Sequence, residues 1–149
     1  SFALTVFFSI GIFMTYIGGL LGDKYGPIKI IRLSLLIWLP SMFLLTQVPE
    51  FSVTIMMPLA YLILLMIGAA KAISYSPVIV LGQTYLAKSI GFASGITLGV
   101  SQTIGGIIAP VVGNLADTYS LPAAMMTLVP FLIVGLVASL LLKDPKKLQ

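Results

Sequence analysis

The sequence predicts an all-α membrane protein with five transmembrane helices. Of its 149 residues, 59% are hydrophobic and only 8% are charged, and the mean hydropathy is +1.15. Soluble domains carry about 25% charged residues, so this chain lacks the polar surface that water requires. Because a backbone inside lipid has to satisfy its own hydrogen bonds, the long apolar runs are expected to be helices rather than strands.

Five apolar runs approach or exceed the roughly 20 helical residues that cross a hydrocarbon core of about 30 Å. They cover residues 1–21, 30–46, 53–81, 91–112 and 121–142. The third run is too long for one straight crossing, because a helix of its length extends about 43 Å at about 1.5 Å per residue. It is therefore expected to tilt, to bend near Pro77, or to emerge from the lipid as a helix. The connections are short, which predicts one compact bundle over residues 1–149.

The basic residues predict the orientation of these helices, because Lys and Arg are retained on the cytoplasmic side of a membrane. Seven of them fall on one side of the expected bundle: Lys24, Lys29, Arg32, Lys88, Lys143, Lys146 and Lys147. The connections on the other side, QVPEFS and NLADTYS, carry only the acids Glu50 and Asp117. The start of the chain is therefore expected outside and the C-terminus in the cytoplasm.

Composition also bounds the function. The chain has neither histidine nor cysteine, and a membrane enzyme would need a nucleophile with a base or a cluster of metal ligands. We therefore predict no enzyme, no catalytic residue, no metal and no cofactor. The net charge of +4 does not indicate a nucleic-acid partner, since basic residues interleaved with aromatic ones on a soluble surface are missing. A channel or a small oligomeric exporter is a more serious alternative, but it would show a charged or carbonyl-rich filter or a membrane glutamate.

The stretch GGLLGDKYG, from Gly18 to Gly26, places an acid, a base and four glycines directly after an apolar run. Its spacing resembles the loop signature of the major facilitator superfamily, written G-x-L-a-D-r-x-G-r-k. The matching positions are Gly19, Asp23, Lys24, Gly26 and Lys29. The sequence departs from the signature at Pro27 and Ile28, where the family prefers basic residues.

The resemblance implies a transporter of twelve helices in two halves, with the signature after the second and after the eighth helix. Four further crossings and a short basic tail, KDPKKLQ, follow it here, which suits helices 8 to 12, the C-terminal half without its first helix. The implied partners are the N-terminal half of the same transporter, the lipid bilayer, a small-molecule substrate and protons. In the family the loop acid contacts a helix of the opposite half during gating, and Asp23 is in its position.

A stripe of small residues predicts a second motif in residues 91–112 and just beyond. Steps of three and four place the following residues on one helical face: Gly91, Gly95, Gly99, Gln102, Gly106, Pro110 and Gly113. Such stripes usually let helices pack closely in lipid. Gln102 is expected either to bridge to a neighbouring helix or to face the transport cavity. The segment GGIIAPVVGN, which begins at Gly105, resembles the antiporter motif G-x-x-x-G-P-x-x-G-G with two glycines replaced.

Longer stretches suggest a branch of this superfamily. The run SYSPVIVLGQTYLAKSIGFASGITLG, with GGIIAP and GNLAD after it, resembles the fosmidomycin-resistance proteins. These are bacterial inner-membrane drug exporters, usually described as proton-driven. The resemblance thus implies efflux of a small drug or organic anion, and uptake or exchange of an organic anion metabolite is the alternative.

Lys71 is the candidate for substrate chemistry. A lysine inside a membrane helix costs roughly 2.5–3.5 kcal/mol at the bilayer centre, so it usually faces a cavity or a partner. Helical spacing places Tyr75 on the same face, and a cavity lysine would suit a phosphonate or a carboxylate. The alternatives are that Lys71 extends to the cytoplasmic surface, or pairs with an acid of the other half. No acid lies in the middle of a run, so a proton-exchanging carboxylate is expected elsewhere, unless Asp23 or Asp117 acts from a helix end.

Overall fold

The computed structural model describes the backbone of residues 2–47 and 53–142, and the side chains of residues 9–47 and 58–142. This part of the chain consists of helices and short connections, which confirms the predicted all-α fold. Four charged residues of the orientation argument lie outside the described residues: Glu50, Lys143, Lys146 and Lys147.

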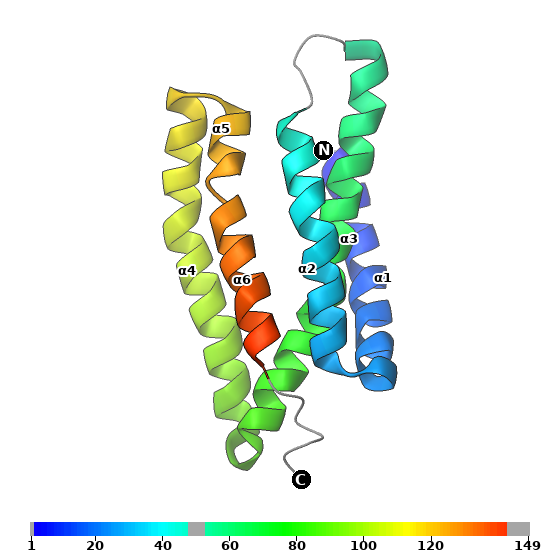
Figure 1. Cartoon of the computed structure of the whole chain (residues 1–149), viewed down its shortest axis with the longest axis vertical. Coiled ribbons are helices and arrows are strands. Elements are labelled where there is room, and N and C mark those ends of the chain that lie inside the picture. The colour runs from blue at the N-terminus through cyan, green and yellow to red at the C-terminus, as the bar shows by residue number, and fades with distance from the viewer. Residues whose placement is uncertain (1, 48–52, 143–149) are drawn as a thin grey trace.

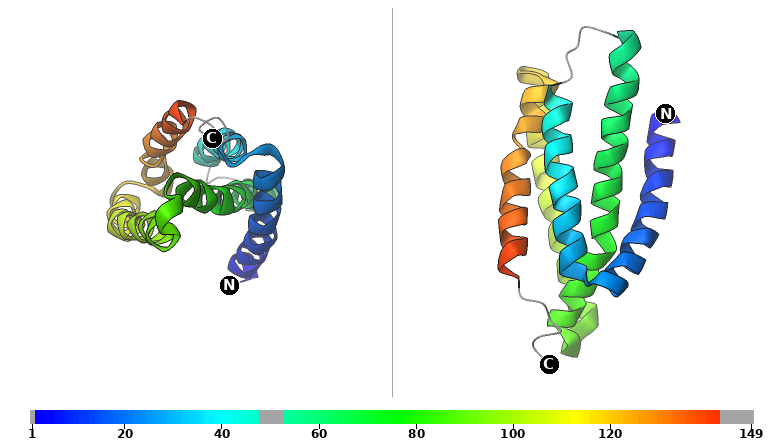
Figure 2. Two further views of the ribbon diagram at one scale, coloured as in Figure 1. Left: turned by 90° about the horizontal axis from the view of Figure 1, so that it is seen from below. Right: turned by 45° about the vertical axis from the view of Figure 1, so that its right-hand side comes forward.

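The helices form two groups that α3 connects (Figure 1). The first group contains α1 (Phe2–Tyr25), α2 (Pro27–Thr46) and α3 (Val53–Tyr85), and α3 contacts both of its neighbours. The second contains α4 (Ile90–Thr118), α5 (Leu121–Met126) and α6 (Val129–Leu141). The short helix η1 (Ala87–Ser89) joins α3 to α4. The two views of Figure 2 show that α3 changes direction in its second half, so that its end reaches α4.

The helices run further than the apolar runs that predict them. The α1 helix continues to Tyr25, because the Gly26 N–H donates a helical bond of 2.9 Å to the Gly22 carbonyl, and α2 begins at Pro27. Proline suits the first turn of a helix, where its missing N–H would have no helical partner. The α4 helix continues to Thr118, so Asp117 lies in its last turn rather than in a loop.

The last apolar run is divided into α5 and α6, with Thr127 and Leu128 between them. Pro130 stands in the first turn of α6 and has no N–H to donate to the carbonyl four residues before it. A break at this point is therefore a direct effect of the local sequence. The Thr127 hydroxyl donates to the Ala124 carbonyl at 2.6 Å and closes the end of α5.

The interior is small and most apolar side chains face outward. Ile28 and Ile31 of α2 and Leu81 of α3 form the buried cluster, with Leu35 packed against it. The described residues contain four helical stretches that are long and apolar enough to cross a membrane: Pro27–Thr46, Pro58–Tyr85, Ala87–Thr118 and Leu121–Leu141. Exposed leucine, isoleucine and phenylalanine on such helices are suited to lipid, so the chain is a multi-pass membrane protein.

The connections that carry basic residues lie at one end of the bundle. The α1–α2 turn, the η1 corner and the end of α6 are all at the lower end in Figure 1. Lys24 and Lys29 flank the first of these and Lys88 lies in the second. Their common position agrees with the sequence pattern. That this end faces the cytoplasm stays a prediction.

Candidate functional site

The residues of the loop signature form a helix end and a one-residue turn rather than an extended loop. Asp23 and Lys24 lie in the last turn of α1, and Gly26 alone separates α1 from α2. Gly26 has a φ of 96°, a conformation that side-chain-bearing residues rarely adopt. The two charged side chains are exposed, and the Lys24 Nζ lies 5.4 Å from the centre of the Tyr25 ring. Lys29 is exposed in the first turn of α2.

The glycines before Asp23 face α3. A Cβ atom on Gly19 would lie 3.2 Å from the Ser76 Oγ, and one on Gly22 would lie 3.2 Å from the Pro77 Cγ. Gly22 is buried, as is Pro77. This part of the signature therefore lets α1 and α3 approach closely, and the exposed Asp23 follows directly after the contact.

Lys71 lies on an exposed face of α3, 14 residues or about 21 Å before its end at Tyr85. Tyr75, one turn later, is 48% exposed, whereas Gly68, one turn earlier, is buried. Ser74 donates its hydroxyl proton to the Lys71 carbonyl at 2.9 Å, so that hydroxyl is used inside the helix. Lys71 and Tyr75 thus present an amine and a phenol one turn apart on a largely apolar helix.

Gln102 is exposed on α4 and is not next to this pair. The α3–α4 contact lies near the η1 corner, where Gln83 Nε2 donates to the Ser94 Oγ at 2.8 Å and a Cβ on Gly82 would lie 2.7 Å from the Thr97 Oγ1. From that corner the two helices diverge (Figure 1). Lys71 and Gln102 therefore lie on two different helices that diverge from each other.

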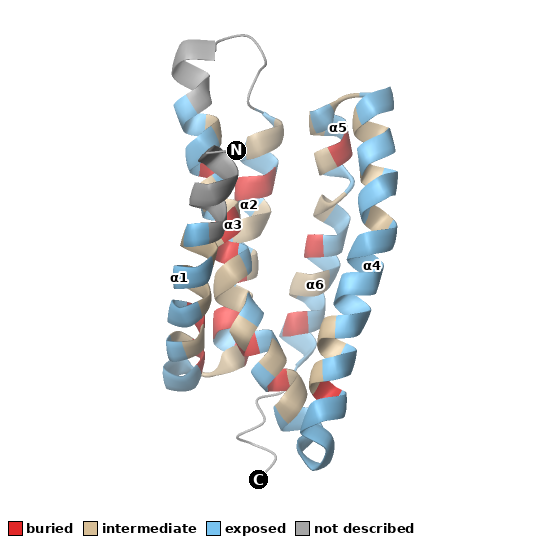
Figure 3. Cartoon of the chain, turned by 180° about the vertical axis from the view of Figure 1, so that it is seen from behind, coloured by how far each residue is buried: buried red, intermediate tan, exposed pale blue. Residues whose placement is uncertain are grey.

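The small-residue stripe of α4 faces away from the other described helices. A Cβ atom would meet nothing within 4 Å at the stripe glycines, which are Gly91, Gly95, Gly99, Gly106 and Gly113, or at Gly105 of the antiporter-like motif. Pro110 is exposed as well, and most of α4 is exposed in Figure 3. Close packing of this stripe stays a prediction, and a partner would have to come from outside the described residues.

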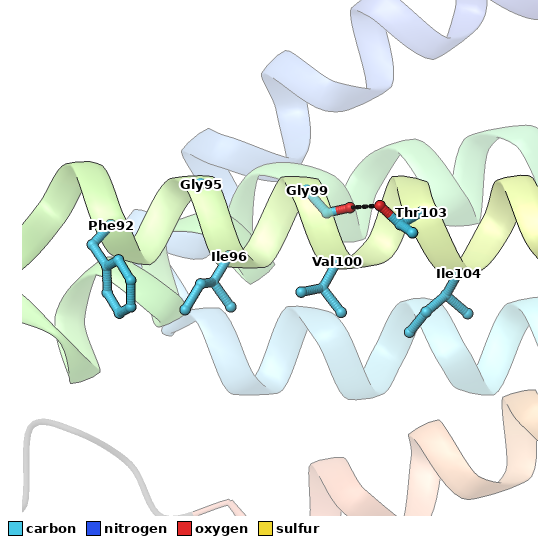
Figure 4. A pocket seen from close by; sticks show the side chains of 7 residues that line it. All are labelled: Phe92, Gly95, Ile96, Gly99, Val100, Thr103 and Ile104. Carbon is cyan, nitrogen blue, oxygen red and sulfur yellow. Dashed lines mark hydrogen bonds between the residues drawn. The ribbon is translucent and has the colours of Figure 1, made fainter.

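Beside the stripe is a shallow apolar hollow of about 440 Å³ (Figure 4). All of its lining residues belong to α4: Phe92, Gly95, Ile96, Gly99, Val100, Thr103 and Ile104. The Thr103 hydroxyl donates to the Gly99 carbonyl at 2.8 Å, so the hollow offers hydrocarbon and hardly any free polar group. It is an open helix face rather than a closed binding cavity.

Sequence reasoning missed the role of Arg32, which it treated only as an orientation signal. The guanidinium donates from Nε and Nη2 to the Ser139 carbonyl at 3.0 and 2.8 Å. Nη2 also lies 3.3 Å from the Leu140 and Leu142 carbonyl oxygens. The last carbonyls of a helix have no helical partner, so Arg32 caps α6 from α2. The only signal for this contact is an arginine among basic residues that are otherwise lysines.

The described residues hold no group of three or more acidic, histidine or cysteine side chains that could bind a metal ion. The exposed groups of the candidate site are an amine, a phenol and an amide. These can bind an anion through charge and hydrogen bonds, and they offer no nucleophile with a base beside it.

Comparison with known proteins places these features in context. The sequence profile of the Major Facilitator Superfamily matches residues 1–149. An uncharacterized MFS-type transporter of Bacillus subtilis (strain 168), YfnC, is 33% identical over 141 residues, which are 95% of this chain and 33% of that protein. The chain thus spans about a third of the length of this relative. No solved structure is significantly similar to this chain.

Proposed function

Because the chain belongs to the major facilitator superfamily, we propose that it forms helices 8 to 12 of a twelve-helix secondary transporter. Four stretches that could cross a membrane, α1 before them with the signature at its end, and a relative about three times as long support this assignment. In such a transporter two bundles rock about a site near the bilayer midplane, which opens to one side at a time. The transporter is placed in a bacterial inner membrane, with the end that carries Lys24 and Lys88 in the cytoplasm.

The substrate is proposed to be a small organic anion, and the exposed amine of Lys71 carries this proposal. A charged side chain far from the end of an apolar helix is stable only beside water, a counter-charge or a ligand. Tyr75 adds a hydrogen-bonding phenol one turn away, and Gln102 adds an amide from α4. A phosphonate or carboxylate would satisfy the amine and the phenol, and Gln102 would reach the same anion only in a conformation that brings α4 closer to this part of α3.

Transport is proposed to be efflux coupled to protons, as the resemblance to the fosmidomycin-resistance branch implies. No acid lies within the described part of the membrane spans away from a helix end. The proton-exchanging carboxylate is therefore assigned to the N-terminal half, or to Asp23 or Asp117. The alternative function is uptake or exchange of an organic anion metabolite. It would use the same Lys71 amine and would differ from efflux only in the gradients that drive the substrate.

In the complete transporter, Asp23 of the loop signature and the glycine stripe of α4 would both contact the N-terminal half. Asp23 stands exposed at the end of α1 and would contact a helix of the N-terminal half when the cytoplasmic side closes. The open glycine stripe of α4 would receive another helix of that half, because no described element occupies it. Both assignments depend on the N-terminal half as the partner.

The first experiment measures movement of a fosmidomycin-like phosphonate in vesicles that contain the complete transporter, with and without a proton gradient. We expect gradient-dependent movement in the wild type and its loss in Lys71→Ala. Lys88→Ala is the matched control, since Lys88 is an exposed lysine at the η1 corner. It should transport like the wild type.

Three results would change the proposal. Equal transport by Lys71→Ala and Lys88→Ala would remove the anion site. Movement that is insensitive to the gradient would remove proton coupling. No movement of the phosphonate, with movement of a carboxylate metabolite instead, would favour the alternative carrier.

A further inference from the structure

Pro77 is buried in the second half of α3, where the helix continues on both sides of it. Proline has no N–H, so the carbonyl of Ile73, four residues earlier, loses its helical hydrogen bond. A free carbonyl inside a membrane helix needs another partner, because lipid offers none. The structure places that carbonyl against α1.

Gly18 of α1 is the residue that meets it. A Cβ atom on Gly18 would overlap the Ile73 carbonyl oxygen and would lie 2.8 Å from the Ile73 Cα and carbonyl carbon. Only the hydrogen of a glycine fits there. A glycine Cα–H can donate a weak hydrogen bond to a carbonyl oxygen, which is weaker than the helical bond that Pro77 removes.

The next turn of α1 completes the contact. Gly22 is buried and faces the Pro77 ring, whose Cγ would lie 3.2 Å from an added Cβ. Gly18, Gly19 and Gly22 of α1 therefore present backbone without a side chain toward α3. Across this backbone α3 contributes the Ile73 backbone, the Ser76 hydroxyl and the compact Pro77 ring, so the two helices lie close together without a large side chain between them at these glycines.

The two parts of α3 have different neighbours around this point. Beyond Pro77, α3 contacts α4: Gly82 packs closely against Thr97, and Gln83 donates a hydrogen bond to Ser94. Before Pro77, the helix lies beside α1 and α2 (Figure 1). Leu81 also packs on α2, but through apolar contacts that tolerate small displacements. A bend at Pro77 would therefore carry α4 relative to α1, and α5 and α6 would have to shift along α2, which they also contact.

We propose that Ile73–Pro77 of α3, seated on Gly18–Gly22 of α1, is a hinge that lets α4 move relative to α1. The weakened backbone bond allows the bend, and the glycine surface keeps the hinge packed while it moves. The hinge goes beyond the proposed function and does not depend on the substrate. It also gives Gly19 and Gly22 of the loop signature a structural role within this chain.

The test measures distances between α1 and α4 in the complete transporter by electron spin resonance. The chain has no cysteine, so nitroxide labels can be attached at Phe13→Cys and Ile107→Cys, with any cysteine outside this chain replaced. Both positions are exposed, at 71% and 66%. We expect a broad or two-peaked distance distribution in the wild-type background.

The decisive variant is Pro77→Ala, which restores the N–H and the bond to the Ile73 carbonyl. It should narrow the distribution to one peak, whereas Pro58→Ala, at an exposed proline of the same helix, should leave it unchanged. Gly18→Ala should shift the mean distance, and Gly11→Ala, where an added Cβ meets nothing within 4 Å, should not.

Identical distributions for the wild type and Pro77→Ala would overturn the hinge, even if Gly18→Ala does not fold. Narrowing by Pro58→Ala as well would also overturn it, because the effect would then not belong to this point of α3. The readout needs no transported substrate. A failure of the transport experiment and a failure of the hinge are therefore distinguishable.

Discussion

Replacement of Arg32 tests how the two helix groups are held together near the end of α6. The guanidinium makes two hydrogen bonds to the Ser139 carbonyl and two longer ones to the carbonyls of Leu140 and Leu142. Hydrogen bonds to charged groups contribute about 1.5–3 kcal/mol, and a cation at a helix C-terminus adds about 0.3–1 kcal/mol. Because the two shortest bonds share one acceptor, we expect Arg32→Met to cost about 2–3 kcal/mol in total rather than the sum of four bonds.

The loss should appear as local opening of α6. A cost of 2–3 kcal/mol corresponds to about 30- to 140-fold faster amide hydrogen exchange in the last turn of this helix, at 1.4 kcal/mol per factor of ten. Mass spectrometry of a peptide that covers residues 136–142 measures it in the complete transporter. Arg32→Lys should recover about half of the free energy, since an ammonium keeps the charge but loses the planar fork.

The control is Lys29→Met, which removes an exposed charge one turn earlier in α2. It should leave exchange in α6 unchanged. If Arg32→Met exchanges no faster than Lys29→Met, the contact contributes nothing measurable, and the argument from carbonyl capping is refuted.

Three further variants test the remaining assignments. Asp23→Asn should slow transport by the complete protein while membrane insertion stays normal, and an unchanged transport rate would remove the gating role. Gly106→Leu should lower the melting temperature of the complete transporter in a thermal-shift assay, because the added side chain blocks a partner helix, whereas Gly11→Leu should not. Equal melting temperatures for the two variants would show that the α4 stripe receives no helix. Gln83→Ala should remove the bond to Ser94 and lower stability by about 1 kcal/mol, measured by denaturant unfolding, and no change in the midpoint would mean that this bond is replaced by water.

Part of the candidate site could be predicted because its residues break local rules. Gly26 matches the signature, and the structure places it with a positive φ directly after α1. Lys71 is conspicuous as a lysine in an apolar run, and the structure places its side chain in an exposed position. Its role as an anion site remains a prediction. Arg32 could not be assigned a partner, because its acceptors are backbone carbonyls more than 100 residues away, at Ser139 and beyond.

The apolar runs alone were enough to predict an all-helical membrane protein, because inside a bilayer the backbone of a single long apolar run satisfies its hydrogen bonds as a helix. The sequence did not determine which faces of those helices meet. In water a hydrophobic stripe marks the buried face, but in a membrane the lipid-facing and helix-facing sides are equally apolar.

The glycines show this limit most clearly. Gly18 lies against the Ile73 backbone, whereas Gly11 and Gly106 face open space within the same chain. All three occur in similar apolar surroundings in the sequence. Only the tertiary structure separated them, because close packing in lipid depends on the fit of one helix surface to another, and that fit is a property of two segments together.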